Sequence, residues 1–479
     1  MAFAVTNLIN MAYGAEVTPG TVPTISFQQM RVKGQSLNPN LTYIKSGEFR
    51  ADRQIPDQIL TDQSPGGALD LEVSYGAVDD FWAAVLQNAL TWSGPANFLT
   101  GASVTSSSVF TVASGGTAAV VNSLVYSKGW TTAGNNGVNV VTASSGTTIT
   151  VTGTPLTIES SGTGKTLEVI GIQGASGDIT ATSNGLASTT LDFTTLGLAV
   201  GQWLKLGGAL AANQFAINAA NNGFARITAI AAHALTLDNL PTGWGVDAGT
   251  GKLIRIQFCD YICNGTTQTA FTLERAHTDV TNGYFDFSGM YPNTASIAFK
   301  VGALLDSNIN FMGLSTTRNA ASLSTGAYTA APTNSVFNAA SNVVRVYEGG
   351  AASGKIQDFT ANLNNNLRAQ KAVGTLGNAG IGVGQFEATL QFNMYLVTGT
   401  GTAIYDKFIN STQSSFSTAI QDTAGNAYLF TFPAVKYTSC SVNAGSVNQD
   451  CILGMTAAAK LDTLTNCMFQ IDRLAVYGA

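Results

Sequence analysis

Few residues in this chain of 479 have the types and spacing that catalysis or nucleotide binding requires. The Gly-Lys-Thr sequence at 164–166 matches the end of a phosphate-binding P-loop, but that motif needs a glycine five places earlier, where Glu159 stands. A second Gly-Lys pair at 251–252 occupies the equivalent place in an internal repeat. We therefore assign this turn to the repeat and expect no nucleotide site.

The histidines and acids form no catalytic set either. His277 follows Glu274 in the segment FTLERAHTD, without a Gly-x-Ser-x-Gly elbow or a second histidine nearby, and we expect a solvated strand edge there. Asp79 and Asp80 stand at the start of a predicted helix, where the helix dipole favours negative charge. A glycosidase needs two carboxylates about 5 to 10 Å apart, and the sequence singles out no such pair. We predict that the protein is not an enzyme.

Five cysteines are present, at positions 259, 263, 440, 451 and 467. Their odd number and wide spacing argue against a disulfide framework. Cys259 and Cys263 have the wrong spacing for a zinc ribbon, and neither histidine stands at ligand spacing from them. We expect small buried side chains in strands, folding in a reducing compartment, and no metal or other cofactor.

The composition indicates a β-rich protein with an almost uncharged surface. Hydrophobic residues make up 45% of the chain and charged residues only 10%, against about a quarter in ordinary proteins. A neutral, hydroxyl-rich surface is typical of particles built from many copies, and also of secreted adhesins. The formal net charge is −6 and no basic run occurs, so tight binding to nucleic acid phosphates is disfavoured.

The sequence also lacks the signals for export and membrane insertion. The first twenty residues, MAFAVTNLINMAYGAEVTPG, have neither a basic n-region nor a continuous apolar core. Nowhere do roughly 18 apolar residues run together. We expect synthesis in a cytoplasm, without export by the general secretory route, and no membrane span.

Two strand-then-helix units lie far apart in the chain. In the first, Leu69, Leu71 and Val73 alternate with polar residues, as in a half-buried strand. The helix that follows it has an apolar side formed by Val78, Phe81, Trp82, Val85, Leu86 and Ala89. In the second unit, residues 386–396 (FEATLQFNMYL) alternate without interruption. A turn at 399–402 then leads into a helix whose apolar residues are Ile404, Tyr405, Phe408 and Ile409.

The middle of the chain is duplicated. Three motifs recur at a nearly constant offset: Asn-Asn-Gly at 135–137 and 221–223, a strand-like segment at 148–151 and 234–237, and Gly-x-Gly-Lys at 162–165 and 249–252. Because Asn-Gly favours the positive φ angles of a type I′ turn, we predict a β-hairpin at each Asn-Asn-Gly. We assign residues 97–174 and 175–256 to two related small modules.

These patterns together predict a mainly β fold. We expect a β-sandwich or β-barrel domain with one or two flanking helices, formed by residues 1–96 and 257–479 and interrupted by the two small all-β modules. Its further strands are predicted at 294–299, 308–312, 357–363, 427–432 and 467–476. Residues 314–336 show no clear period and are predicted to form a long loop.

A charged loop precedes the first strand-then-helix unit. Its charges alternate in sign: Glu48, Arg50, Asp52, Arg53 and Asp57. Such a loop is either simply solvated or makes charge-paired contacts with a neighbouring copy, where opposite charges fix register and partner choice. These five residues are our candidates for a contact between subunits.

Several short phrases, spread in order along nearly the whole chain, carry a family resemblance. Residues 46–54 contain the phrase S-x-E-x-R-x-D-R-Q, and later phrases lie at 271–279, 296–313, 362–367, 405–408 and 425–437. The second module contains VGQWLKLGG (200–208), NNGFARITAI (221–230) and LTLDNLPTGW (235–244), where the first has YSKGW at 126–130. In this order the phrases resemble those of the major tail tube proteins of long-tailed bacteriophages.

The resemblance implies a structural, non-catalytic virion protein. Members of that family form six-membered rings whose subunits contribute strands to a continuous β-barrel, and the rings stack into a hollow tail that conducts DNA to the host. Inserted modules commonly sit on the outside. The resemblance also implies a place in the virion tail and contacts with further copies and with tail terminator, tape measure and distal tail proteins.

The residues alone leave two other functions open. A β-sandwich protein of a virion or cell surface, such as a glycan-binding adhesin, is the alternative to a self-assembling tube. An enzyme that degrades polysaccharides comes third.

Overall fold

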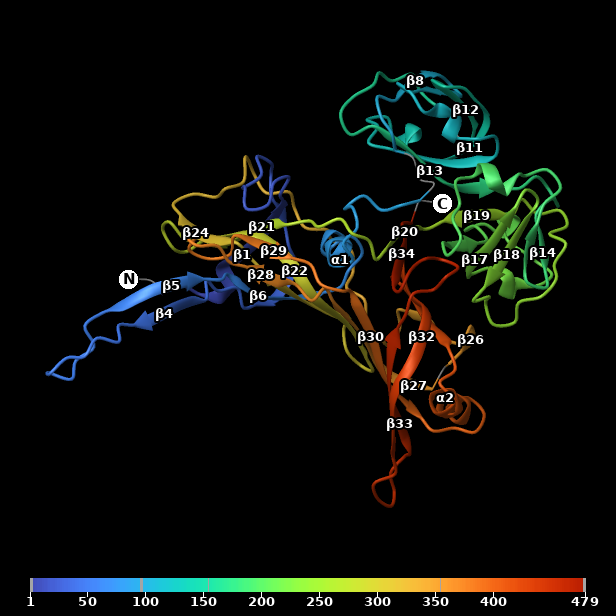
Figure 1. Ribbon diagram of the computed structural model, residues 1–479. Helices are drawn as coiled ribbons and strands as arrows, with labels where there is room; N and C mark the ends of the chain where they lie inside the picture. Colours follow the sequence, from blue (N-terminus) through green and yellow to red (C-terminus); the bar gives the residue numbers. More distant parts are fainter. Residues whose placement is uncertain (1–2, 95–97, 154, 354, 477–479) are drawn as a thin grey trace.

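The computed structural model describes residues 3–94, 98–153, 155–353 and 355–476 and confirms a mainly β fold. The strands form two large antiparallel sheets (Figure 1). One of them is built by the middle of the chain, from β7 to β19, and the other by the two chain ends. Within the described residues, two α-helices flank the second sheet: α1 (Asp79–Val85) and α2 (Thr400–Ile409).

The chain ends build a main sheet whose strands come from both sides of the inserted region. Its order is β3 (Val32–Gln35), β6 (Gly66–Glu72), β23 (Asp306–Met312), β22 (Tyr284–Lys300), β27 (Ile356–Asn364), β30 (Glu387–Tyr395), β33 (Ile452–Ala459) and β32 (Ala427–Asn443). The alternation predicted at 69–73 and 386–396 is confirmed by β6 and β30. β6 and β30 each have one buried and one accessible face.

Strand β32 passes from the main sheet into a second layer. Its residues 435–443 pair with β33, whereas residues 427–435 pair with β31 (Ser414–Gln421) and, over 427–431, with β34 (Gln470–Leu474). The second layer also contains β25 (Val343–Glu348), β26 (Ala351–Ala352) and β20 (Asp260–Cys263). The first half of β32 is buried on both faces, which explains its continuous apolar run AYLFTFPAV.

The first half of β22 belongs to a smaller group of strands. It pairs with β21 (Phe271–His277) and β24 (Ser315–Asn319), while β1 (Ile9–Ala15) pairs with β21 and β2 (Gln28–Gln29) with β1. One prediction is wrong here: the His277 segment is no solvated edge, because β21 lies between two strands. The loop predicted at 314–336 is confirmed over residues 320–336. Its first part instead forms β24, a largely exposed strand whose polar sequence gives no apolar period.

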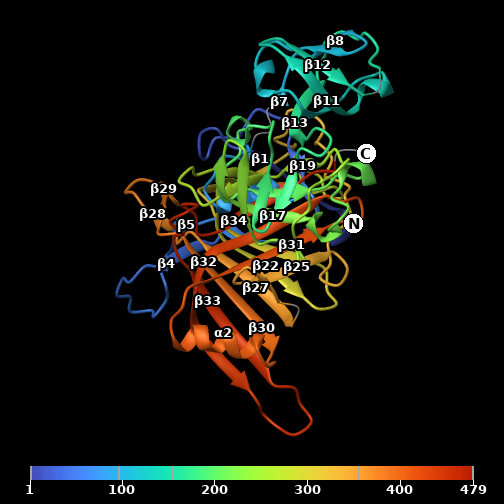
Figure 2. The same ribbon diagram turned by 90° about the vertical axis from the view of Figure 1, so that its right-hand side faces the viewer.

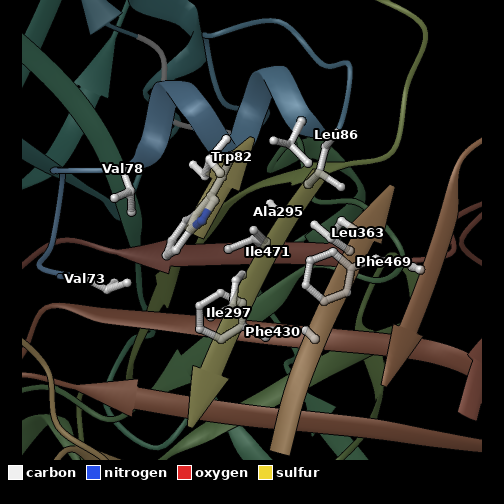
Figure 3. Packing of buried hydrophobic residues seen from close by; sticks show 14 of the residues in the cluster. Val73, Val78, Trp82, Leu86, Ala295, Ile297, Leu363, Phe430, Phe469 and Ile471 are labelled. Carbon is white, nitrogen blue, oxygen red and sulfur yellow. The ribbon is translucent and has the colours of Figure 1, made fainter. Parts of the chain in front are cut away.

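The hydrophobic core lies between the two layers, as Figure 3 shows. Helix α1 fills one end of this space. Trp82 is fully buried there and meets Tyr428 and Phe430 edge to face, with ring centroids 5.1 and 5.4 Å apart. Trp82 also hydrogen-bonds Ser307 of β23, so it joins the main sheet to β32. Truncating a buried aromatic side chain of this kind costs about 3–5 kcal/mol. Ala89, predicted on the same helix face, lies beyond the helix and is exposed.

Helix α2 covers the core at the far end of β32. Ile404 is buried in the core, which confirms this helix prediction, although Tyr405 and Ile409 are exposed. Lys407 ties the helix to the strands through an ion pair with Glu348, at 2.7 Å. Glu348 is buried and also accepts a hydrogen bond from Tyr437.

A cluster of charges joins α1 to the second layer. Arg473 of β34 forms ion pairs with Asp79 of α1 and, at 2.8 Å, with Asp260 of β20. Tyr428 donates a further hydrogen bond to Asp79. Burial opposes the charge of Arg473, but the two carboxylates outweigh this effect and raise its pKa. Asp79 therefore has a structural partner as well as its place in the first helical turn.

The two inserted modules have the same topology. In the first, the order is β8 (Ser103–Ser106), β9 (Val109–Thr111), β12 (Thr148–Thr152), β11 (Gly137–Ser144), β10 (Ser123–Lys128) and β13 (Thr166–Gln173), with β7 (Phe98–Leu99) beside β13. In the second, it is β14 (Thr180–Thr182), β15 (Gly185–Ala187), β18 (Ala234–Asp238), β17 (Phe224–Ala231), β16 (Trp203–Leu206) and β19 (Arg255–Phe258). The equivalent strands β13 and β19 pair with each other and join the two halves.

A hairpin is present at each Asn-Asn-Gly motif, since β10 pairs with β11 and β16 with β17, but the predicted type I′ turn is not. The first asparagine of each motif ends a short 3-10 turn, and Asn136 and Asn222 have negative φ angles of −94° and −83°. The Asn136 side chain instead bonds both backbone polar groups of Trp130, and the Asn222 side chain bonds those of Phe215. The side-chain amide thus replaces backbone turn bonds, a capacity of asparagine that the hairpin prediction ignored.

A pair of buried carboxylates lies among β1, β21, β22 and β24. Glu274 and Asp286 face each other in the paired strands and are fully buried. Glu274 accepts hydrogen bonds from Ser322, Leu323 and Tyr328, and Asp286 accepts one from Asn319. Burial, together with the charge of Glu274, raises the pKa of Asp286 to about 7. Asp286 Oδ1 has no hydrogen-bond donor among the described residues, so nothing at this oxygen opposes the protonated form of Asp286.

We predict that Arg473→Met destabilises the monomer by about 3–5 kcal/mol, because it leaves two largely buried carboxylates without a cation. Urea unfolding of the purified monomer measures this change. Lys33→Met is the control, since Lys33 and its partner Asp306 are both about half exposed and the unfolding midpoint should hardly move. Equal effects of the two substitutions would show that the Arg473 cluster is not structural.

We predict that Asp286→Asn flattens the pH dependence of stability. The folded-state pKa of Asp286 is raised above its unfolded value, so the folded chain keeps a proton that the unfolded chain releases. Its contribution is present below about pH 4 and is lost as the pH rises to about 7. Urea midpoints between pH 4 and 8 should fall less in the variant, which should exceed the wild type at pH 8. Parallel profiles would contradict the raised pKa of Asp286.

Candidate assembly surfaces

An apolar arm projects from the body of the molecule. Strands β4 (Leu41–Lys45) and β5 (Gln58–Gln63) pair with each other and, in the described part of the chain, with no other strand (Figure 1). The arm exposes large apolar side chains to solvent: Leu41, Tyr43, Ile44, Phe49, Ile55 and Ile59. Phe49 at the tip is completely exposed. A single chain leaves this apolar surface in water, which indicates a protein partner.

The five predicted contact residues lie in the tip of the arm and are exposed. Arg50 and Asp52 form an ion pair with each other, at 2.6 Å, and the hydrogen bond from Arg50 lowers the pKa of Asp52. Glu48 and Asp57 lie in the same loop, and Arg53 has a φ of +59° in the turn. The apolar residues of the arm went unnoticed in the sequence because charges surround them. Their signal was Phe49 and Ile55 inside an otherwise polar segment.

The second candidate surface is the open face of the main sheet. Residues paired across neighbouring strands form rows on this face, for example Asp70, Asn308, Ser296 and Asn362. Parallel rows contain Asn310, Thr294, Asn364 and Glu387, and also Thr360, Gln391 and Thr456. The residues that alternate with them in the same strands point to the opposite face and are buried in the core. The open face is therefore a continuous surface of amides, hydroxyls and charges.

The charge of this face is weakly negative. Its carboxylates are Asp70, Glu72, Asp306, Asp358 and Glu387, and the lysines on or beside it are Lys33, Lys300, Lys355 and Lys436. Lys33 is already paired with Asp306 at 2.9 Å. No arginine belongs to the rows described above. A surface of this kind offers few sites at which a polyanion could be held.

Both edge strands of the main sheet have one side without a partner strand among the described residues. Within the described residues, β3 pairs only with β6, and residues 436–443 of β32 pair only with β33. Each edge therefore presents backbone donors and acceptors that no strand of this chain satisfies. Exposed edges of this kind pair readily with another chain. Figure 2 shows the β32–β33 hairpin extending at the end of the molecule opposite to the first module.

The motifs considered for chemistry have structural roles. Lys165 of the Gly-Lys turn forms an ion pair with Glu159, at 2.8 Å, and Lys252 of the equivalent turn bonds the Ala211 carbonyl. In the described ranges, no three His, Cys, Asp or Glu side chains gather as metal ligands would. None of the helices in that part of the chain has the length and apolar character needed to cross a lipid bilayer.

A protein-family model described as "Phage tail tube protein" matches the chain over residues 6–459. This range includes the arm, the main sheet and both inserted modules. No curated protein matches the chain.

We predict that Phe49→Asp prevents polymerisation and leaves the monomer as stable as the wild type. Burying a phenylalanine at a contact is worth about 1.5–3 kcal/mol, and a buried aspartate there would oppose association. Ultracentrifugation measures polymer yield and thermal unfolding measures monomer stability. The control Ile158→Asp alters a similarly exposed apolar residue of the first module and should polymerise normally. Normal polymers of Phe49→Asp would exclude the arm from the contact.

Proposed function

The chain belongs to the family of phage tail tube proteins, and from this premise we propose that it is a structural subunit that polymerises into the hollow tail tube. Six copies form a ring, rings stack, and DNA passes through the bore. The protein acts in the virion tail after synthesis in the host cytoplasm, and it performs no catalysis. The observation that carries this proposal is that the main sheet is covered on one face only and has two unpaired edges.

In the proposed ring, the open face of the main sheet lines the bore. The face is polar, so it can stay hydrated around DNA, and its few lysines are outnumbered by carboxylates. DNA phosphates are therefore not captured as they pass, because non-specific binding requires many basic contacts. The other face of the sheet is unsuited to this role, since it forms the hydrophobic core.

Ring closure pairs the β3 edge of one copy with the free part of β32, residues 436–443, in the next. Each edge has unsatisfied backbone groups, and the two edges terminate opposite ends of the same sheet. Repeating this pairing around a ring closes the sheets into one barrel without edges. Closure between copies therefore pairs the backbone N–H and C=O groups of the edges, which would otherwise promote aggregation.

Stacking of the rings uses the β4–β5 arm. Its apolar residues are buried against the neighbouring ring, and Glu48, Arg50, Asp52, Arg53 and Asp57 set the register of the contact. A head-to-tail contact that does not close on itself grows into a filament. The last rings of the filament meet the tail terminator and distal tail proteins, and the bore holds the tape measure protein before DNA passes.

The inserted modules lie on the outside of the proposed tube. The second module is fixed to the second layer, because Trp203 donates to Thr431 and Arg345 donates to the carbonyls of Phe224 and Asn239. That layer is on the opposite side of the core from the open face. Each module has its own main hydrophobic cluster, which supports two modules at about 97–174 and 175–256 within a tube domain of 1–96 and 257–479. The second cluster also includes Ile172 and Phe258, because β13 and β19 pair at the junction.

Electron microscopy of the purified protein tests this function. We expect uniform rings and hollow tubes, with no change in polysaccharide viscosity on mixing. Monodisperse monomers that bind a glycan would instead identify a surface or adhesin-type protein, and a loss of viscosity would identify a polysaccharide-degrading enzyme.

We predict that lysines on the proposed bore make the tube retain DNA. Gln391→Lys with Asn393→Lys adds two charges at exposed positions of β30 on the open face. Tubes should assemble and then bind DNA, with an affinity that falls as salt rises, because counterions are released on binding.

The matched control, Ile158→Lys with Ile217→Lys, adds the same charge to exposed positions of the two modules. DNA retention is measured by filter binding with linear DNA that can enter the tube ends. Equal retention by the two variants would contradict the assignment of the open face to the bore.

A further inference from the structure

Two of the five cysteines lie together. Cys259 and Cys467 are buried as predicted from the sequence, whereas Cys451 is exposed and the other two are half-buried. All five are free thiols. Cys263 and Cys467 differ from the rest because they are neighbours whose side chains change each other's pKa, while the Cys467 thiol donates to the Phe469 carbonyl at 3.1 Å. Nothing in the proposed tube requires this contact.

The backbone brings these two residues together. Cys263 ends β20 and stands opposite Gln470, the first residue of β34. Cys467 precedes β34 by three residues, and the backbone N–H groups of Met468 and Phe469 donate to the Asn264 side chain, at 2.7 and 3.4 Å. The turn after Cys263 is therefore held against the segment that contains Cys467.

The two thiols have different environments. The hydrogen bond with Cys467, opposed by partial burial, lowers the pKa of Cys263 to about 7. The same hydrogen bond and deeper burial raise the pKa of Cys467. Since the thiolate is the nucleophile, Cys263 is partly ionised and partly accessible near neutral pH, and Cys467 is its shielded neighbour.

We propose that Cys263 and Cys467 form a disulfide when the protein meets an oxidising medium, and that this bond locks the C-terminal strand β34 onto β20. The timing rests on the proposed function, because a virion protein folds in a reducing cytoplasm and works outside the cell. The pairing itself depends only on the positions of the two thiols.

The reaction is a thiol–disulfide exchange with a small-molecule disulfide such as oxidised glutathione. The Cys263 thiolate attacks one sulfur of the oxidant and releases one glutathione thiolate. Cys467 then loses its proton to water, attacks the Cys263 sulfur and releases the second glutathione thiolate. The protein loses two electrons and two protons, and the oxidant is reduced to two thiols.

The bond would act on the strand that carries the Arg473 charge cluster. Strand β34 contains Arg473, which holds Asp79 of α1 and Asp260 of β20. A cross-link between positions 263 and 467 closes a long loop, which restricts the unfolded chain more than the folded one. Subunits in a released particle would therefore resist unfolding better than newly made ones.

Peptide mapping of the native full-length protein tests the proposal. The protein is incubated with oxidised glutathione at about pH 8, free thiols are blocked with N-ethylmaleimide, and the digest is examined by mass spectrometry with and without reductant. We expect one cross-linked peptide pair containing residues 263 and 467, two fewer N-ethylmaleimide adducts on the intact protein than before oxidation, and a higher urea midpoint that reductant reverses.

Cys263→Ala and Cys467→Ala should each abolish the cross-link and the rise in the urea midpoint, whereas Cys440→Ala should keep both. A lasting glutathione adduct on Cys263, or a 263–467 cross-link that forms only in urea, would overturn the proposal, and the wild-type map decides this even where a variant fails to fold. Because the soluble subunit is used, a cross-link without tubes would count against the proposed function alone.

Discussion

The structure depends on a β-sheet that is covered on one face only. The second layer and the two helices cover the apolar face of the main sheet and form one core with it. The other face is left to water, so its residues are amides, hydroxyls and scattered charges. Because both edges also lack partners in the described chain, the sheet has a free face and two free edges. In the proposed ring, the free face lines the bore and the two free edges pair with neighbouring copies.

The positions of α1 and the inserted region follow from the same constraint. Strand β32 has to leave the main sheet to build the cover, and its first half is then buried on both faces. Tyr428 and Phe430 meet Trp82 on one side, while Leu429 packs with Trp203 of the second module on the other. The second module thus covers the outer side of the second layer, which would otherwise be exposed to solvent. The module does not cover the open face of the main sheet.

The regular elements could be predicted from sequence where one face is buried. β6, β30 and both helices have clear periods, and the duplicated motifs revealed two modules of identical topology. The prediction failed where side chains replace backbone bonds, as at Asn136 and Asn222, and at β24, where an exposed strand has no apolar period. The charged loop was found, but its apolar neighbour Phe49 was not, since a period cannot reveal an exposed contact.

A residue-resolution cryo-EM map of the assembled polymer tests the central claim most directly. The account predicts that Asn308, Ser296, Asn362 and their row neighbours face the bore, and that β3 of each copy pairs with residues 436–443 of the next. A map in which the modules or the second layer line the bore, or in which both edges of the main sheet face solvent, would contradict it.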